Sequence, residues 1–303
     1  MTEPPPDARD TAARLPYRLL VAQVRAVLED ASVTVPQRMV LPLAGGASLF
    51  LMPAADGRVA MTKLITLTPA NAHCARPTIQ GDVVVFDVAT GERVCVLDGP
   101  TVTARRTAAV SVLAAQLLAP APQGPLLIVG AGVQGRSHLE AFVEMLGVSE
   151  VRIASRSNAS AQALVDHART LGVQASPITD ADAAMRECPL IVTCTPASTV
   201  VIRAMPRSDA FIAAVGAYTP QMVELAPEVC VHLAQQGRIA VDTPEAAHEA
   251  GDLIQAGLDA SSFATLRDVL RSPGPKRGPV LFKSCGWAGW DLAAARTALV
   301  IPA

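Results

Sequence analysis

The sequence predicts an α/β protein in which a Rossmann-type, doubly wound parallel sheet is joined to a discontinuous α+β domain. Three observations support this prediction. Short β-rich runs separated by turns occupy residues 47–97, and from residue 124 short apolar runs alternate with helical segments. The first of these apolar runs leads directly into the glycine-rich segment Gly130–Gly135. Alternating strands and helices are typical of a parallel sheet with helices on both faces.

The first part of the chain predicts a small β-rich domain with two helices. We expect residues 1–12 to form a loose tail, and apolar residues at helical spacing predict a helix over 17–31. An alanine-rich helix is expected over 101–119 and ends at Pro120. Hairpin turns are expected at Asp56-Gly57 and Thr90-Gly91, between strands over 48–52, 59–67, 82–87 and 93–97.

The second part predicts the parallel sheet. Helices are expected from about residue 137 and over 159–171, with strands over 126–129, 151–154, 190–194, 210–215 and 238–241. The segment from Phe282, with a helix over 291–299, has no strand partner in this scheme, so we expect it to pack onto the N-terminal part. The predicted domains are residues 1–119, completed by 283–303, and the Rossmann domain 120–282.

Composition narrows the possible partners. Hydrophobic residues make up 50% of the chain, charged residues 17%, and the net charge is -2, without a basic run interleaved with aromatics. We therefore expect no nucleic-acid partner. We also expect a cytoplasmic protein without a membrane partner, because no apolar stretch could span a bilayer and the N-terminus does not resemble a signal peptide. No Cys-x-x-Cys pair or histidine cluster occurs, so we expect reduced thiols and no metal site.

The pattern Gly-x-Gly-x-x-Gly lies between an expected strand and an expected helix. Gly130 would form the tight turn, Gly132 would let the backbone approach a pyrophosphate, and Gly135 would let the helix pack near the strand. The helix N-terminus would offer free N–H groups and a partial positive charge to the phosphates. This context predicts a dinucleotide cofactor.

The end of the next strand indicates which dinucleotide binds. An NAD site usually has an acidic residue there, whereas this chain has Ser155, Arg156 and Ser157. A guanidinium between two hydroxyls suits a 2′-phosphate, so we predict NADPH as the preferred cofactor and NADH as the second option. The alternative is that Arg156 is a solvated surface residue.

Thr193 and Thr195 follow a later strand of the predicted sheet. Their hydroxyls would line the ribose side of the nicotinamide, because cofactors lie at the carboxyl ends of such strands. A plain turn is the alternative.

Two cations in the first part interrupt otherwise apolar surroundings. Lys63 lies inside the run Val59–Leu67, and Arg106 lies near the start of the alanine-rich helix. Burying either charge without an anionic partner is costly, so two cations in one cleft would suit a substrate carboxylate. Exposed surface cations are the alternative.

Several motifs in the right order resemble the ornithine cyclodeaminase/μ-crystallin family, from about Val35 to Leu299. They are Arg38, Leu51-Met52-Pro53, Lys63 with Pro69-Ala70-Asn71, Pro77–Gly81, Thr103–Ala109, the glycine loop, Val241-Asp242, Ala250-Gly251-Asp252 and Phe282–Asp291. The resemblance implies that the first domain binds substrate and forms a homodimer.

The resemblance also implies roles for individual residues. Arg38, Lys63, Thr78 and Arg106 match positions around the carboxylate and reacting nitrogen of an amino or imino acid, with Lys63 and Arg106 taken as catalytic. Gly132, Val133 and Gln134 match the phosphate loop.

One segment departs from the cyclodeaminase pattern. Cyclodeaminases carry an Asp in Gly-Gly-Asp-x-Pro-Gly-Lys-x-Glu that handles protons, and in the corresponding segment Gly216–Glu224 this chain has Tyr218 at that position. The missing carboxylate and the missing NAD-type acid instead resemble the ketimine reductase branch. Its bacterial members reduce Δ1-pyrroline-2-carboxylate to L-proline and Δ1-piperideine-2-carboxylate to L-pipecolate.

The resemblance therefore predicts hydride transfer to the imine carbon of a cyclic imino acid. Arg38 and Arg106 would clamp the carboxylate and Thr78 would add a hydrogen bond. Lys63 would donate a proton or position a water, with its pKa lowered by neighbouring cations. Tyr218 would either point into the cleft or pack as a loop aromatic. The alternative functions are an ornithine cyclodeaminase, an alanine dehydrogenase-type enzyme and a μ-crystallin-like protein that binds small ligands.

Overall fold

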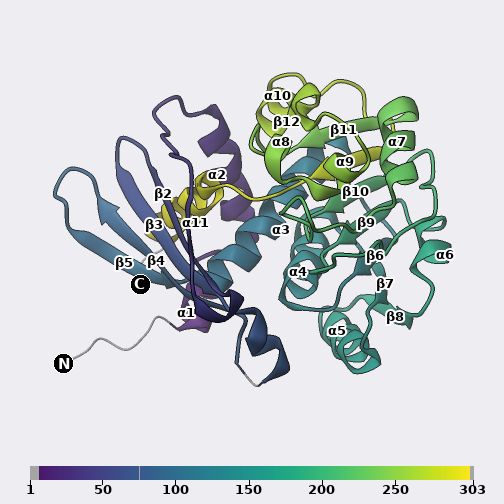
Figure 1. Ribbon diagram of the computed structural model, residues 1–303, viewed down its shortest axis with the longest axis horizontal. Helices are drawn as coiled ribbons and strands as arrows, with labels where there is room; N and C mark the ends of the chain where they lie inside the picture. Colours follow the sequence, from purple (N-terminus) through teal and green to yellow (C-terminus); the bar gives the residue numbers. More distant parts are fainter. Residues whose placement is uncertain (1–6, 75, 301–303) are drawn as a thin grey trace. The chain divides into compact units, whose positions relative to one another are not determined.

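The computed structural model describes residues 7–74 and 76–300 of the 303-residue chain (Figure 1). These residues form two compact units. The first contains the chain up to Arg106 together with the residues from Trp287 onward, and the second is Thr107–Gly286. The division falls inside a long helix, α3 (Gly99–Leu118), and residues 283–286 lie in the second unit. Within the described residues, we find no helix with the length and apolar character needed to span a bilayer.

The first unit is built on a five-stranded antiparallel sheet in the order β1-β2-β3-β4-β5. Its C-terminal helix α11 (Ala288–Val300) lies against β2, β3 and helix α2, and residues 288–295 of α11 are all buried. The remaining elements are α1 (Ala8–Ala13), α2 (Tyr17–Glu29), β1 (Met39–Pro42), β2 (Ser48–Ala55), β3 (Val59–Leu67), β4 (Ile79–Asp87), β5 (Arg93–Asp98), and the short 3-10 helices Ala44–Gly46 and Pro69–His73.

In the first unit one expectation needs correction and one strand was not predicted. Residues 8–13 form helix α1 rather than a loose tail, because Asp7 caps the helix and the buried Thr11 hydroxyl accepts a hydrogen bond from the Asp98 N–H at 3.0 Å. The expected tail over residues 1–6 lies outside the described residues. Strand β1 was not predicted, because its four residues show no alternation of polar and apolar side chains. In the structure all four are exposed.

The second unit contains an eight-stranded parallel sheet in the order β12-β11-β13-β10-β9-β6-β7-β8. The strands are β6 (Leu126–Val129), β7 (Glu150–Ala154), β8 (Gln174–Ile178), β9 (Leu190–Thr193), β10 (Phe211–Ala214), β11 (Arg238–Val241), β12 (Ala264–Thr265) and β13 (Val280–Lys283). The helices are α4 (Val133–Leu146), α5 (Asn158–Thr170), α6 (Ala181–Met185), α7 (Pro227–Gln236), α8 (Ala246–Glu249), α9 (Gly251–Gln255), α10 (Leu266–Arg271) and the 3-10 turn Ala260–Ser262.

The expectation that the segment from Phe282 lacks a strand partner is wrong. Strand β13 lies between β10 and β11 and pairs with both, with Phe282 opposite Ala213 and Ala240. The apolar run Val280–Phe282 is short, and a lysine follows it directly. The charge of Lys283 is tolerated there because the buried Asp252 carboxylate lies 2.8 Å from its Nζ.

The order of the strands places a switch point at the carboxyl end of β6. Strands β7 and β8 lie on one side of β6, and β9 and the later strands lie on the other. The Gly130 N–H donates to the Ala154 carbonyl at 2.9 Å, and the Cys194 N–H donates to the Val129 carbonyl at 2.9 Å. The ends of β6, β7 and β9 therefore meet where doubly wound sheets bind their ligands.

A buried histidine holds helix α4 in place behind this switch point. The Nδ1 atom of His138 lies 2.8 Å from the Gln134 carbonyl, and its Nε2 lies 3.0 Å from the Ser111 hydroxyl of α3. Burial lowers the pKa of His138 to about 4, so the ring is neutral near pH 7. Nδ1 must then donate to the carbonyl, and Nε2 accepts from Ser111.

Candidate active site

At two positions of the glycine loop a side chain could not be accommodated. Gly130 has a φ of +116°, and a Cβ there would lie 2.8 Å from the Cys194 carbonyl oxygen. A Cβ on Gly135 would lie 2.0 Å from the Gly130 carbonyl oxygen, so only glycine lets α4 start this close to β6. A Cβ on Gly132, by contrast, would meet nothing within 4 Å.

The loop and the start of α4 fit the pyrophosphate of a dinucleotide. Gly132 is the N-cap of this 14-residue helix and offers no side chain to cap its first N–H groups. Val133 and Gln134 lie in the first turn, and Val133 is 69% exposed. Open space at Gly132, uncapped N–H groups and the positive end of the helix together form an anion-binding arrangement.

Ser155, Arg156 and Ser157 follow β7, next to the glycine loop in the sheet. Ser155 is half-buried, and its hydroxyl accepts a hydrogen bond from the Ser157 N–H at 3.3 Å. The Ser157 hydroxyl caps helix α5 by accepting from the Ser160 N–H at 3.2 Å. Arg156 is exposed, and its long side chain can move to meet a ligand.

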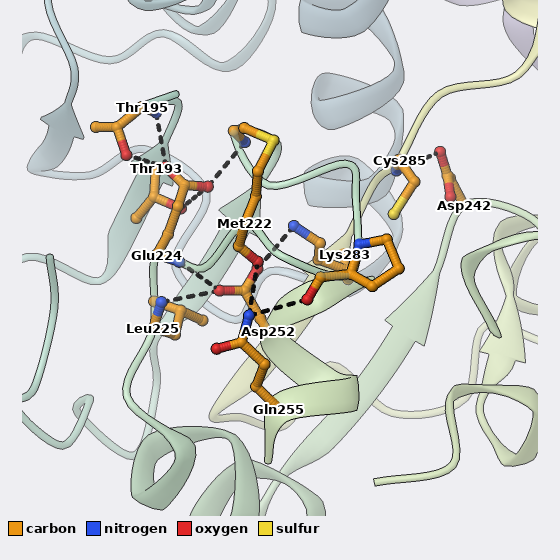
Figure 2. A network of polar contacts seen from close by, with 12 residues as sticks. Thr193, Thr195, Met222, Glu224, Leu225, Asp242, Asp252, Gln255, Lys283 and Cys285 are labelled. Carbon is orange, nitrogen blue, oxygen red and sulfur yellow. Dashed lines mark hydrogen bonds and ion pairs between the residues drawn. The ribbon is translucent and has the colours of Figure 1, made fainter. Parts of the chain in front are cut away.

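Glu224 is the centre of a buried network at the carboxyl ends of β9 and β10 (Figure 2). One oxygen accepts from the Thr195 N–H at 2.7 Å and the Thr195 hydroxyl at 2.9 Å. The other accepts from the Thr193 hydroxyl at 3.0 Å and the Gly216 N–H at 2.7 Å. Burial raises the pKa of Glu224, and four donors that point at its oxygens favour the ionised form.

These contacts change the expected role of the two threonines. The Thr193 side chain is fully buried and its hydroxyl donates to Glu224, so it does not line a ribose. Thr195 directs both its N–H and its hydroxyl to the same carboxylate. Both hydroxyls therefore fix the end of β9 to the Glu224 carboxylate.

A second layer supports Glu224. The Asp252 carboxylate accepts from the Glu224 N–H at 2.6 Å and the Leu225 N–H at 2.9 Å, and its other oxygen lies 2.8 Å from Lys283 Nζ (Figure 2). Burial alone would lower the pKa of Lys283, but the attraction of Asp252 and Glu224 raises it above its ordinary value. Lys283 is thus a permanently charged structural residue at neutral pH.

Asp242 holds the chain where it leaves the second unit. Its Oδ2 accepts from the Ser284 hydroxyl at 2.8 Å, the Cys285 N–H at 3.0 Å and the Gly286 N–H at 2.8 Å. The next residue is Trp287, from which the chain continues into α11.

The first unit contains a buried cluster of Lys63, Arg106 and Asp291. Asp291, in the first turn of α11, lies 2.8 Å from Lys63 Nζ through Oδ2 and 3.2 Å from Arg106 Nε through Oδ1. The three side chains are at most 7% exposed. Burial lowers the pKa of Lys63 to about 8, against the attraction of Asp291 and together with the repulsion of Arg106 and Arg38. The cluster carries two cations and one anion, so its charge suits an added carboxylate.

Strand register relates Arg38 and Thr78 to this cluster. Met39 pairs with Leu51, Met52 with Lys63, and Lys63 with Val83, so Arg38 stands one residue before β1 in the row that contains Lys63. Thr78 precedes β4 and is five residues from Val83, which corresponds to about 16 Å along a strand. Arg38 and Arg106 thus lie close enough to Lys63 to influence its pKa, and Thr78 stands further along the strand direction, just before β4.

Neighbouring arginines on α3 have different partners. Arg105 Nε donates to the Leu15 carbonyl at 2.8 Å, and its guanidinium lies 3.9 Å from the centre of the Tyr17 ring. Arg106 faces Asp291 instead. Tyr218, the residue at the cyclodeaminase Asp position, is half-buried and packs against the hydrophobic core of the second unit.

Sequence reasoning missed the carboxylates of both networks. Asp242, Asp252 and Asp291 appeared only as family motif residues, and Glu224 appeared only within the Tyr218 segment. The available signal was a charged residue inside or directly beside an apolar run, as at Lys283 and Asp291. Such residues are rarely buried without a partner of opposite charge.

The doubly wound sheet and its glycine loop define a dinucleotide-binding enzyme. A profile described as the ornithine cyclodeaminase/mu-crystallin family matches residues 17–299, so the chain belongs to this family.

The chain is similar to named reductases over nearly its whole length. It is 39% identical to Delta(1)-pyrroline-2-carboxylate reductase 1 of Burkholderia multivorans, over 96% of this chain and 94% of that protein. It is 38% identical, over 96% and 94%, to the Delta(1)-pyrroline-2-carboxylate/Delta(1)-piperideine-2-carboxylate reductase of Azospirillum brasilense. Its fold is similar to that of Thermococcus litoralis Delta(1)-pyrroline-2-carboxylate reductase in complex with NADH and L-proline, with a TM-score of 0.87, 22% identity and 96% and 94% coverage.

Glu224→Gln tests whether the buried network supports the cofactor site. A carboxamide has only one acceptor oxygen, and its NH2 group would face a backbone N–H, which can only donate. We therefore expect a loss of about 2–4 kcal/mol in unfolding free energy. Cofactor affinity should fall as well, because the strand ends lose their shared anchor. Urea unfolding and NAD(P)H fluorescence titration measure the two effects. Glu228→Gln, at an exposed position on α7, is the matched control and should leave both unchanged. Equal stability of the two variants would contradict the assigned role.

Proposed function

We propose that this chain is an NAD(P)H-dependent reductase of cyclic ketimines. The reaction would convert Δ1-pyrroline-2-carboxylate to L-proline and Δ1-piperideine-2-carboxylate to L-pipecolate. The observation that carries the proposal is the pairing of Lys63 and Arg106 on one buried carboxylate, Asp291, in a chain with a dinucleotide loop. The names of the bacterial relatives support the same substrates.

The cationic cluster supplies two functions that ketimine reduction needs, binding of the carboxylate and donation of a proton to the ring nitrogen. Arg106 meets Asp291 through Nε, so its fork of Nη donors can bind a second carboxylate, and Arg38 in the same row adds positive charge. The pKa of Lys63 at about 8 suits proton donation to the ring nitrogen near neutral pH. When bound, the reduced nicotinamide supplies the hydride for the imine carbon. Thr78 remains a candidate through the family resemblance alone.

Tyr218 separates this proposal from a cyclodeaminase. Deamination in that branch relies on an ionisable Asp, and here a half-buried tyrosine packs against the core at that position. The reductase consumes its cofactor, whereas a cyclodeaminase recycles it. A binding protein of the μ-crystallin kind would bind ligand with little turnover.

The decisive assay follows NADPH absorbance in parallel with each cyclic imine, with pyruvate plus ammonia, and with L-ornithine. We expect oxidation with the imines alone. Arg106→Met should lower kcat/KM by on the order of 100-fold, because one partner of a buried charged hydrogen bond is removed. Arg105→Met, whose native side chain contacts Leu15 and Tyr17, should lose stability and keep its KM. Absence of oxidation with both imines would rule out the proposed reaction.

We propose further that Arg156 makes the enzyme prefer NADPH over NADH. Arg156→Ala should raise the KM for NADPH by about 10- to 100-fold, because a charged contact to the 2′-phosphate is lost, and should leave the KM for NADH unchanged. Arg169→Ala, which removes another exposed arginine of the second unit, is the control. An unchanged ratio of the two KM values in Arg156→Ala would refute this assignment.

We also propose that two copies pair through the outer face of the five-stranded sheet, as the family resemblance implies. The inner face is buried, whereas Leu51 faces Leu64 and Val84 faces Val96 on the outer side. Leu64 is 42% exposed and Val94 is 47% exposed. Apolar side chains gathered on one exposed face favour association with a complementary copy.

Leu64→Asp should convert the dimer to a monomer, because a charge would be buried at the centre of that face. Light scattering coupled to size-exclusion chromatography gives the molar mass. Leu171→Asp, at an exposed leucine after α5, should leave it unchanged. A wild-type monomer, or a Leu64→Asp dimer, would contradict this interface.

A further inference from the structure

The chain contains three lysines, Lys63, Lys276 and Lys283. Lys276 is exposed, whereas the other two are at most 1% exposed. Each buried lysine forms an ion pair of 2.8 Å with a fully buried aspartate, Lys63 with Asp291 and Lys283 with Asp252. The two pairs therefore have the same length and the same burial.

The charges around the two pairs are opposite. Lys283 has two carboxylates nearby, Asp252 and Glu224, and its pKa is raised despite burial. Lys63 has one carboxylate and two cations, Arg106 and Arg38, and its pKa is lowered to about 8. Because the residues opposite Lys63 on β2 and β4 are the apolar Met52 and Val83, Asp291 is the anion that opposes this shift.

We propose that Asp291 is a positioning residue that keeps Lys63 in its ammonium form and so sets the upper pH limit of imine reduction. The inference rests on the proposed function. It adds that the carboxylate which fixes Lys63 and Arg106 in space also determines the protonation of the proton donor.

Imine reduction consumes a proton, so the protonation state of Lys63 controls the rate. Reduction of a C=N bond adds a hydride at carbon and a proton at nitrogen. The proton leaves Lys63 Nζ, which becomes a neutral amine and takes a new proton from solvent before the next turnover. Activity therefore requires the ammonium form, and it declines as pH rises through the pKa of Lys63.

Removing the Asp291 charge should move this limit toward acid. Burial and the two arginines then act on Lys63 without opposition, so its pKa falls further below its ordinary value. In Asp291→Asn we expect the alkaline limb of kcat/KM to shift down by at least one pH unit. Activity should persist at pH 6 and be lost near pH 8.

Lysine NMR tests the inference without turnover. Protein labelled with 13C at lysine Cε gives three signals, which Lys63→Arg and Lys276→Arg assign. In wild type we expect Lys63 to titrate near pH 8 and Lys283 above the ordinary lysine value. In Asp291→Asn the Lys63 midpoint should fall by at least one unit. A wild-type Lys63 that titrates near pH 10.5, or an unchanged midpoint in the variant, overturns the proposal.

Two further variants separate positioning from general loss of structure. Asp252→Asn breaks the matched pair in the other unit and should lower stability without moving the Lys63 midpoint. Lys63→Arg keeps the positive charge but cannot donate a proton near neutral pH, so kcat should fall by about 100-fold or more. If Lys63→Arg turns over like wild type with the same alkaline limb, another group donates the proton and the proposal fails, even where Asp291→Asn does not fold. If wild type reduces neither imine, the proposed function fails, and the NMR titration still decides whether Asp291 holds Lys63 charged.

Discussion

The ion pair between Lys63 and Asp291 joins residues more than two hundred positions apart and determines much of the first unit. An ammonium buried in an apolar sheet is costly unless a carboxylate meets it at close range. The carboxylate comes from α11, so the pair brings the C-terminal helix to the middle strand of the sheet. Arg106 shares the same carboxylate, which fixes the start of α3 as well. One charge requirement thus orders three elements and gathers the cations of the candidate site.

Charge requirements of the same kind organise the second unit. Glu224 accepts hydrogen bonds from the ends of β9 and β10, and Asp252 accepts from the Glu224 N–H. Lys283, at the end of β13, supplies the positive charge that offsets the two carboxylates. These groups lie under the strand ends where a doubly wound sheet takes its dinucleotide. Because backbone N–H groups can only donate, the acceptors must stay ionised or at least unprotonated on the facing oxygens. The shape of the cofactor side therefore depends on buried charge as much as on the glycine loop.

Local patterns in the sequence predicted the fold well. The predicted bounds of β3, β6 and β11 match the structure, because each is a clear apolar or alternating run closed by turn residues. The fold class and the family prediction are confirmed. Strand β13 was missed. It ends in Lys283, and a lysine is buried only where a carboxylate meets it, which here comes from the distant Asp252. The roles of Asp291 and Glu224 were missed for the same reason, since no local pattern pairs a residue with a partner far along the chain.

Residue type alone did not assign function in three further cases. Arg105 and Arg106 are adjacent and identical, yet one stacks on Tyr17 and the other meets Asp291, because successive residues of a helix face different directions. Thr193 seemed suited to a ribose, but its hydroxyl points inward to Glu224. Lys63 and Lys283 form equivalent ion pairs with aspartate, and they differ in the surrounding charge. A surplus of carboxylate makes Lys283 a fixed structural cation, and a surplus of arginine leaves Lys63 ready to release its proton. The same surplus of positive charge attracts a substrate carboxylate, so one arrangement of charges both binds the anion and activates the donor.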